Sequence, residues 1–490
     1  MVTLPDLLNA AVTAHMAGDG NRAGRLYRRA LALDPAAAPA LHLLGTLAAQ
    51  GGQAGPASAW LARALRVEPA APAVWAHLGG VRLAAGNAGG AATALQRALV
   101  LEPDQPDAAV NLGLACHTGH TLEAATRWLW RAHRLRPGHR NSLLNLGLVL
   151  RDRQRFADAE ACFATLTAAA DTDRDAHLAL ALGRLVQGDL AAGWAGFERR
   201  WKRFSSPPWM AGQPLPPGGT LLLHAEQGFG DTIQFARYVP DAVAAAARHG
   251  ARVVLEVHPH LVRLLRTLPV PPSGPLTIVP RGETPPPFDA QCPLMSLPRA
   301  FATNRVADIP APVPYLSPAP DEAAAWAARL DDGSGRLRVG LVWAGNPSHR
   351  NDRNRSMPLD ALDPLLDVAG VRLFSLQTGP ARAALPPRWA ARLDDPMDAV
   401  EDFAATAALL AGLDLLVTVD TAPLHLAGAL GRPAWLLLPY APDWRWFLGR
   451  ADTPWYPTVR LFRQDRPGAW ARVGQAVARH LRRALERRAG

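Results

Sequence analysis

The chain has 490 residues, with 52 Lys+Arg against 42 Asp+Glu, a net charge of +10 and a pI near 10.5. Lys202 is the only lysine, so a Walker-A phosphate loop, which needs its own lysine beside Ser or Thr, is excluded. Any phosphate must therefore be bound by arginine, histidine, hydroxyl groups or backbone amides.

The cysteines and the charge pattern indicate a soluble, cytoplasmic protein. Cys116, Cys162 and Cys292 lie far apart and form no CxxC pair, so we expect neither a disulfide framework nor a metal site. The long apolar stretch at 413–438 is interrupted by Asp420 and Arg432, which predicts no membrane span. The basic excess is spread along the chain without a lysine-rich tail, so we expect no nucleic-acid partner.

Residues 1–205 repeat with a period of 34. The period predicts one pair of antiparallel helices per unit, with Gly and Ala where the helices cross and proline after the second helix. The repeated positions are Pro35, Pro69, Pro103 and Pro137; Gly45, Gly79, Gly113 and Gly147; and Ala30, Ala64, Ala98 and Ala132. This pattern resembles the tetratricopeptide repeat. Leu182-Gly183 lies two residues out of register, so we expect the sixth unit to be a drifting or capping one.

Helical repeats of this kind bind proteins or peptides on their concave face. Asn111 and Asn145 share one column, just before the Leu-Gly pair, and we expect them to hydrogen-bond the backbone of a bound peptide. The alternative is that both asparagines are ordinary solvated side chains.

After a Pro/Gly-rich linker at 206–218, buried strands alternate with helices, as in βαβ units. We therefore expect a C-terminal α/β part made of two Rossmann-like domains, at 219–320 and 321–490, with a cleft at the carboxyl ends of their strands. The expected strands are 220–225, 252–257, 276–279, 338–344, 371–376, 414–419 and 433–438, and the expected helices include 232–249, 260–268 and 421–430.

Three loops that follow strands carry the candidate site residues. The first holds Glu226, Gln227, Gly228, Gly230 and Asp231, where Asp231 opens a helix and has an N-cap role as its alternative. The second offers Asn346, Arg353, Arg355 and Ser356 as anion or hydroxyl ligands. In the third, Asp420 ends a strand, the amides near Thr421 and Ala422 begin a helix suited to phosphate, and His425 lies one turn further. We also expect Gln377, after another strand, to line a nucleotide base.

Two of these loops resemble the heptosyltransferase-type glycosyltransferases of family nine. The matching residues are Gly230-Asp231 and the block Asp420-Thr421, His425-Leu426 and Ala429. The resemblance implies the GT-B fold, inversion at the sugar and no need for a metal or cofactor beyond the nucleotide-sugar substrate. It implies that Asp231 is the general base, that Asp420 holds donor hydroxyls, and that the Thr421 helix start binds the diphosphate. Arg355 would replace the lysine common in those enzymes.

The sequence thus predicts a glycosyltransferase that modifies a protein acceptor recruited by the repeats. Two alternatives remain: an interaction scaffold with an inactive transferase domain, and a transferase that builds lipopolysaccharide or capsule glycan. The aromatic run at 440–447, with Trp455 and Tyr456, either stacks on a substrate or forms core.

Overall fold

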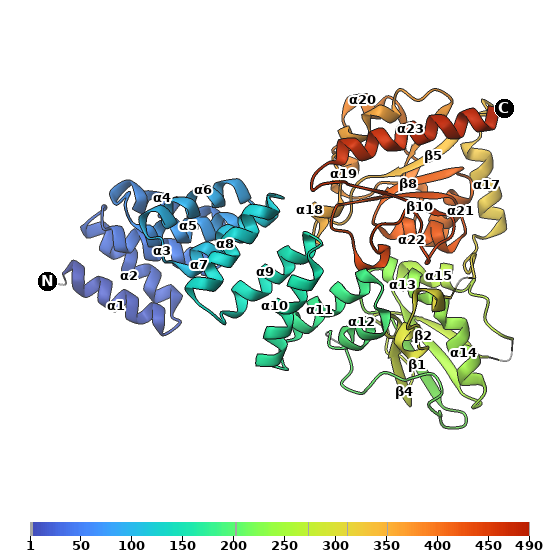
Figure 1. Ribbon diagram of the computed structural model, residues 1–490, viewed down its shortest axis with the longest axis horizontal. Coiled ribbons are helices and arrows are strands. Elements are labelled where there is room, and N and C mark those ends of the chain that lie inside the picture. The colour runs from blue at the N-terminus through green and yellow to red at the C-terminus, as the bar shows by residue number, and fades with distance from the viewer. Residues whose placement is uncertain (1–2, 201–202, 273, 311, 350, 490) are drawn as a thin grey trace. The chain divides into compact units, whose positions relative to one another are not determined.

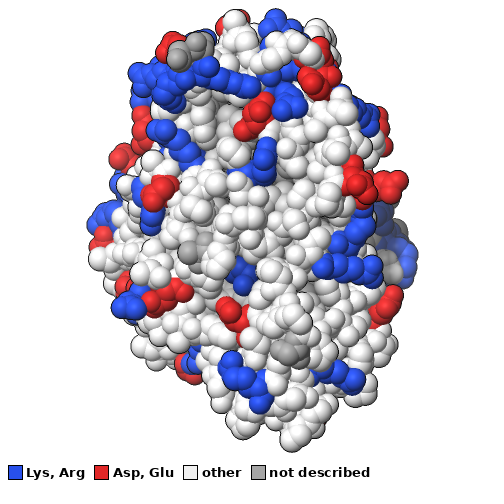
Figure 2. All heavy atoms as spheres, turned by 90° about the vertical axis from the view of Figure 1, so that its right-hand side faces the viewer, with Lys and Arg blue, Asp and Glu red and all other residues white. Residues whose placement is uncertain are grey.

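The computed structural model describes residues 3–200, 203–272, 274–310, 312–349 and 351–489 (Figure 1). Lys202 lies outside these residues. The chain forms two compact units, Met1–Ala176 and His177–Gly490. Within the described residues, no helix is both long and apolar enough to cross a membrane. On the face drawn in Figure 2, Arg side chains are interspersed with Asp and Glu over a largely uncharged surface.

The first unit is a solenoid of helix pairs, which confirms the repeat prediction (Figure 1). A Cβ on Gly113 would lie 2.6 Å from Leu129 Cγ, so the glycine column is required where the two helices of a pair cross. Each second helix ends two residues before the repeated proline, because the residue before proline avoids the helical region. The helices are α1 (Leu4–Met16), α2 (Gly20–Leu33), α3 (Ala38–Gln50), α4 (Ala54–Val67), α5 (Pro72–Ala84), α6 (Ala88–Leu101), α7 (Pro106–Thr118), α8 (Leu122–Leu135), α9 (Arg140–Asp152) and α10 (Phe156–Ala169).

The sixth helix pair, α11 (Arg174–Gln187) and α12 (Leu190–Phe197), begins 34 residues after α9 and α10, so the predicted drift out of register is wrong for the helices. Ala181 takes the place of the repeated glycine, 34 residues after Gly147, and a Cβ on Gly183 would meet no atom within 4 Å. The two compact units divide within α11, after Ala176. The buried Trp194 of α12 packs on Phe235 and Trp444, which belong to the α/β part. The expected ends of the repeats at 205, of the linker at 218 and of the first Rossmann-like domain at 320 stay predictions.

The first sheet of the second unit is parallel, with the order β3-β2-β1-β4. β2 and β3 lie on one side of β1, whereas β4, which comes later in the chain, pairs with β1 on its other side. The strand order therefore reverses between β1 and β4. A crevice forms at the carboxyl end of a sheet at such a point. The strands are β1 (Thr220–His224), β2 (Arg252–Val257), β3 (Leu276–Pro280) and β4 (Ala290–Pro293).

The second sheet is also parallel, with the order β10-β9-β8-β5-β6-β7, and its order reverses between β5 and β8. Its apolar side chains pack with those of α23 (Trp470–Ala489) in one core cluster that includes Val339, Val417 and Leu481. The strands are β5 (Leu337–Val342), β6 (Val371–Ser375), β7 (Leu393–Asp394), β8 (Leu415–Val419), β9 (Ala434–Leu438) and β10 (Val459–Arg463).

Two predicted helices are broken. The helix expected at 232–249 consists of α13 (Phe229–Phe235), a 3-10 turn (Ala236–Tyr238) and α14 (Val239–Ala247). Pro240 has no amide to donate in a continuous helix, so it sits in the first turn of α14 instead. The segment expected at 260–268 forms only a 3-10 turn (Pro259–Leu261) and α15 (Val262–Leu265).

Candidate functional site

The loop after β1 lies at the reversal point of the first sheet and leads into α13. Asp231 stands in the first turn of this helix, where its Oδ2 accepts a 2.8 Å hydrogen bond from the amide of Gly228. The N-cap residue of α13 is thus Gly228, and Asp231 is the third residue of the helix, with its carboxylate bonded back to the N-cap amide. Its side chain keeps 20% of its exposure, and Oδ1 points toward the second Rossmann-like part, as described below.

The other residues of this loop have different surroundings. Glu226 is 5% exposed at its side chain and accepts hydrogen bonds from Arg200 Nη2 at 2.6 Å and Nε at 3.1 Å. Arg200 also donates to Ser296 at 2.8 Å. Glu226 thus ties the segment after α12 to the first sheet, whereas Gln227 is exposed.

The second loop lies at the reversal point of the other sheet, beside the end of β8. Arg355 Nη1 donates to the Asp420 carbonyl at 3.1 Å, and Nε donates to Asp352 at 3.1 Å. A Cβ on Gly345 would lie 2.6 Å from Arg355 Nη2, so the loop needs glycine for this close approach. Arg353 is exposed. Of the two arginines, Arg355 is the one that reaches the start of the third loop.

Three further polar residues of the predicted set hold the loop backbone. Ser356 Oγ accepts from the Gly345 amide at 2.8 Å, and Asn346 Oδ1 accepts from the Ser348 amide at 3.0 Å. Gln377 is 2% exposed; its Oε1 accepts from the amides of Trp343 and Ala344 at 3.0 and 2.9 Å, and its Nε2 donates to the carbonyls of Ala344 and Thr378. The Gln377 side chain therefore positions the loop after β5, which differs from the expected role beside a nucleotide base.

Asp420 lies at the end of β8 in a buried, aromatic environment. Trp446 Nε1 donates to its Oδ2 at 2.9 Å, and His425 Nε2 lies 3.8 Å from its Oδ1. Burial, followed by the nearby Asp443 carboxylate, raises the pKa of Asp420 to about 6. Burial, followed by the charge of Arg445, lowers the pKa of His425 well below its usual value. His425 is therefore a neutral ring at pH 7, with its Nδ1 3.0 Å from the Tyr456 hydroxyl.

The helix after β8 is α22 (Ala422–Ala429). Thr421 is its N-cap residue, but its side chain makes no capping bond with the helix amides. The Thr421 hydroxyl instead donates to the Val419 carbonyl at 3.2 Å and lies 3.1 Å from the Thr418 hydroxyl. The first turn of α22 therefore keeps amides without a side-chain cap, as an anion site at a helix N-terminus requires.

Arg445, which was not among the predicted site residues, connects the two sheet domains. Its Nη2 donates to Asp231 Oδ1, its Nε donates to Gln234 Oε1 at 2.7 Å, and its Nη1 donates to Asp443 Oδ1 at 2.8 Å. The guanidinium also lies 4.4 Å from the ring centroid of Trp444. These carboxylates raise the pKa of Arg445 above its usual value despite burial. The sequence feature that could have indicated this residue is the presence of two charged residues, Asp443 and Arg445, inside the aromatic run at 440–447.

α13 and α22 pack directly against each other. A Cβ on Gly230 would lie 2.7 Å from His425 Cδ2 and 3.6 Å from Ala422 Cα. Gly230 thus allows the first turns of the two helices to meet, which brings the loops after β1 and β8 into one site. The aromatic side chains beside it are buried, as their interpretation as core predicts; they are Trp444, Trp446, Phe447, Trp455 and Tyr456.

The two asparagines of the repeats lie on first helices, α7 and α9. Asn145 Nδ2 donates to the Asn141 carbonyl of its own helix at 2.8 Å. The Nδ2 of Asn111 lies 3.8 Å from the position that a Cβ on Gly80 would take, so it faces the neighbouring first helix, α5. Both side chains are partly exposed, and their role in peptide binding stays a prediction.

The most diagnostic part of this geometry is the strand–loop–helix unit around Asp420. Residues 401–443 match the model of glycosyltransferase family 9 (heptosyltransferase). The matched segment runs from the start of α21 (Phe403–Ala411) through β8, Asp420 and α22 to Asp443. The second unit therefore contains a segment similar to the family 9 glycosyltransferases, on a fold consistent with GT-B.

Other comparisons cover larger parts of the chain. Protein FlbA of Caulobacter vibrioides is 30% identical over 334 residues, which are 63% of this chain and 54% of FlbA. The chain thus spans about half the length of this curated relative. Among solved structures, MamA matches with a TM-score of 0.32 and 21% identity, over 34% of this chain and 90% of its own. YrrB, described as a TPR protein with an unusual peptide-binding site, matches with a TM-score of 0.32 and 22% identity, over 35% and 88%.

Proposed function

We propose that the chain is a glycosyltransferase that moves a sugar from a nucleotide-sugar donor, with inversion, onto a protein acceptor recruited by the repeats. The observation that carries this proposal is Arg445, which pairs with Asp231 from the first sheet domain while it lies beside Asp443 and Asp420 of the second. A carboxylate that follows β1 and the family 9 segment thereby share one site.

The chemistry follows from single displacement at the anomeric carbon. Asp231 takes the proton of the acceptor hydroxyl, the acceptor oxygen bonds to the anomeric carbon, and the bond from that carbon to the diphosphate oxygen breaks. The nucleoside diphosphate leaves with the electron pair, and Arg355 and the uncapped amides of α22 compensate its charge. Asp420 accepts hydrogen bonds from donor hydroxyls when it is ionised, that is, above its pKa of about 6.

The Asp231 carboxylate can act as the general base although it also accepts a hydrogen bond from Arg445. A carboxylate has about four lone-pair sites, so Oδ1 and Oδ2 each keep one for a substrate hydroxyl. The remaining exposure of the Asp231 side chain supports access to that hydroxyl. In this proposal Arg445 orients the base.

The test is sugar transfer by the full-length protein, with a panel of labelled nucleotide sugars and lysate of the native host as acceptor source. Asp231→Asn keeps the shape and the cap acceptor, and we expect it to reduce transfer about 10²- to 10⁴-fold. Asp452→Asn is the matched control, because Asp452 is an exposed partner of Arg450 away from the site. Equal transfer by Asp231→Asn and the control would remove Asp231 as the base. If no donor is hydrolysed or transferred by the wild type, the scaffold alternative replaces the enzyme.

A further inference from the structure

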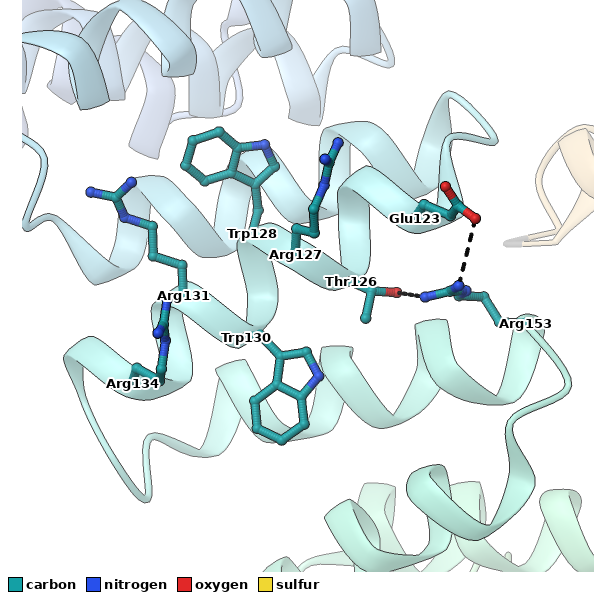
Figure 3. Close-up of a pocket in the computed structure, with 8 residues that line it drawn as sticks. All are labelled: Glu123, Thr126, Arg127, Trp128, Trp130, Arg131, Arg134 and Arg153. Atoms are coloured by element: carbon teal, nitrogen blue, oxygen red, sulfur yellow. Dashed lines mark hydrogen bonds and ion pairs between the residues drawn. The ribbon is translucent and has the colours of Figure 1, made fainter.

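A pocket of about 950 Å³ lies in the first unit, along the second helix of the fourth repeat (Figure 3). Most of its lining residues come from α8, and Arg153 reaches them from the end of α9. Asn111 and Asn145, by contrast, belong to the first helices. The pocket is therefore separate from the peptide surface expected from the sequence. It is lined by Glu123, Thr126, Arg127, Trp128, Trp130, Arg131, Arg134 and Arg153.

The stripe on α8 has the spacing of a single helix face. Relative to Glu123, its members fall four, seven, eight and eleven residues further along, which places them one above another. The stripe spans about 10 Å between Arg127 and Arg134, at about 1.5 Å per residue. It therefore presents arginine and tryptophan side chains together. These members are Arg127, Trp130, Arg131 and Arg134.

The internal repeat indicates that the fold does not require these side chains. At the position of Trp130, the other repeats have Arg28, Ala62, Gln96 and Ala164. At the position of Arg153, they have Ala17, Gly51, Ala85 and Gly119. Since the same helix pair forms with small or polar residues at both positions, the packing of the solenoid does not explain this composition.

The pocket has a charge excess that its own residues do not neutralise. Four arginines face one glutamate, which leaves a net charge of +3. Glu123 lies 3.8 Å from Arg153, so its charge is already partly matched. In the described part of the chain, neither Arg127 nor Arg134 takes part in a hydrogen bond or an ion pair. These two guanidiniums are available to an anion.

Other side chains of the pocket are held in place before any ligand binds. Arg153 donates to the buried Thr126 hydroxyl at 3.1 Å, and Arg131 donates to the Pro103 carbonyl at 2.9 Å. Arg131 also lies 5.6 Å from the ring centroid of Trp128. Trp130 is 44% exposed, which is unusual for so large an apolar side chain. An occupant thus finds fixed guanidiniums and an open indole face.

We propose that this pocket binds an acidic peptide segment of a partner protein, with carboxylates on Arg127 and Arg134 and an apolar side chain against Trp130. Guanidinium groups bind carboxylates in bidentate fashion, and indole rings bury apolar side chains, so the two kinds of group suit a segment that mixes both. The volume is at the upper end of the range for small-molecule pockets, which leaves room for several side chains. A nucleic acid fits less well, because the Glu123 carboxylate lines the same pocket and the stripe is short.

This inference deepens the proposed recruitment of a protein acceptor, but it is tested without any donor sugar. A failure of sugar transfer therefore leaves it standing, and a failure of peptide binding leaves the transferase reaction standing. The probe is a fluorescein-labelled synthetic peptide in which glutamates flank a central leucine. Binding to the full-length protein is followed by fluorescence anisotropy at low and at physiological salt.

We expect the peptide to bind, and the affinity to fall as salt rises. Arg127→Ala with Arg134→Ala, which removes no hydrogen bond or ion pair among the described residues, should weaken binding at least about tenfold, and Trp130→Ala should weaken it as well. The matched control is Arg25→Ala with Arg66→Ala, because these exposed arginines hold the same two repeat positions outside the pocket. The control should bind as the wild type does.

Three outcomes would overturn the proposal. The first is equal affinity of the pocket variant and the control variant. The second is equal affinity of the acidic peptide and a peptide with glutamine in place of each glutamate. The third is a single-stranded oligonucleotide, or a vesicle of anionic phospholipid, that binds more tightly than the peptide and depends on the same two arginines.

Discussion

Arg445→Ala is the substitution that tests the junction between the two sheet domains most directly. It removes the bonds to Asp231, Asp443 and Gln234, and the contact with the Trp444 ring. Breaking a buried ion pair by removing one partner costs about 3–5 kcal/mol, because the other charge is left without compensation. The Asp231 and Asp443 carboxylates are partly exposed to water, so we expect a loss of unfolding free energy at the lower end of this range, about 3 kcal/mol.

The assay is urea unfolding of the full-length protein, followed by circular dichroism and compared at the same transition. With a slope of about 1–3 kcal/mol per molar urea, the loss corresponds to a midpoint shift of about 1 M or more. The matched control is Arg450→Ala, whose bonds to Asp452 are also short but lie at the surface, where a pair contributes at most about 1 kcal/mol. Adding Asp231→Asn to Arg445→Ala should recover part of the loss, because it removes one of the charges that Arg445 leaves unpaired.

The contrary result is an Arg445→Ala variant whose midpoint shifts no more than that of Arg450→Ala. In that case water would compensate the carboxylates as well as the guanidinium does, and the ion pair could not be what holds Asp231 beside the family 9 segment. A shift that Asp231→Asn makes larger would also contradict the argument.

Two further predictions concern the repeats and the buried carboxylate. Gly113→Ala should destabilise the protein by about 1–3 kcal/mol, because its Cβ meets Leu129. Gly89→Ala, at an open helix position, should stabilise the protein by about 0.5–1 kcal/mol. Thermal unfolding of both variants checks this, and equal effects of the two substitutions would contradict it. Because the pKa of Asp420 is raised to about 6 from about 3.9 in an unfolded chain, its contribution to stability is fully present below pH 4 and is lost as the pH rises through 6. The free energy of unfolding of Asp420→Asn, measured in urea, should therefore rise by up to about 3 kcal/mol relative to that of the wild type between pH 4 and pH 7. A difference between the two proteins that does not change with pH would refute the burial argument.

The sequence predicted most of the sheet strands because their residues form apolar runs between turn residues. The run at 252–257 coincides with β2, and the strands expected at 220–225 and 371–376 each end one residue earlier in the structure. β4, β10 and the two-residue β7 were missed. β4 holds Gln291 and Pro293, and β10 holds Arg460 and Arg463, so neither is an apolar run; both form because a neighbouring strand is already in place to pair with them.

The candidate site was predicted as far as the loops, but not as far as the contacts. Loops at strand ends can be read from the sequence, since parallel strands bring their carboxyl ends to one edge. The bond between Arg445 and Asp231 joins residues more than two hundred positions apart, and no local pattern announces such a pair. The same limit applies to Gln377. Its position after a strand suggested that it binds a nucleotide base, whereas its side-chain amide hydrogen-bonds backbone groups of Trp343, Ala344 and Thr378.

The 34-residue period has a consequence for how such a protein can diversify. In a solenoid each helix pair contacts only its neighbours, so a complete unit can be gained, lost or exchanged without disturbing the packing of the others. Trp130 of α8 and Arg153 illustrate this, because one unit has a tryptophan and an arginine at positions where the other units have different residues. Choice of partner can therefore change one unit at a time, while the residues around Asp231 and Asp420 stay as they are.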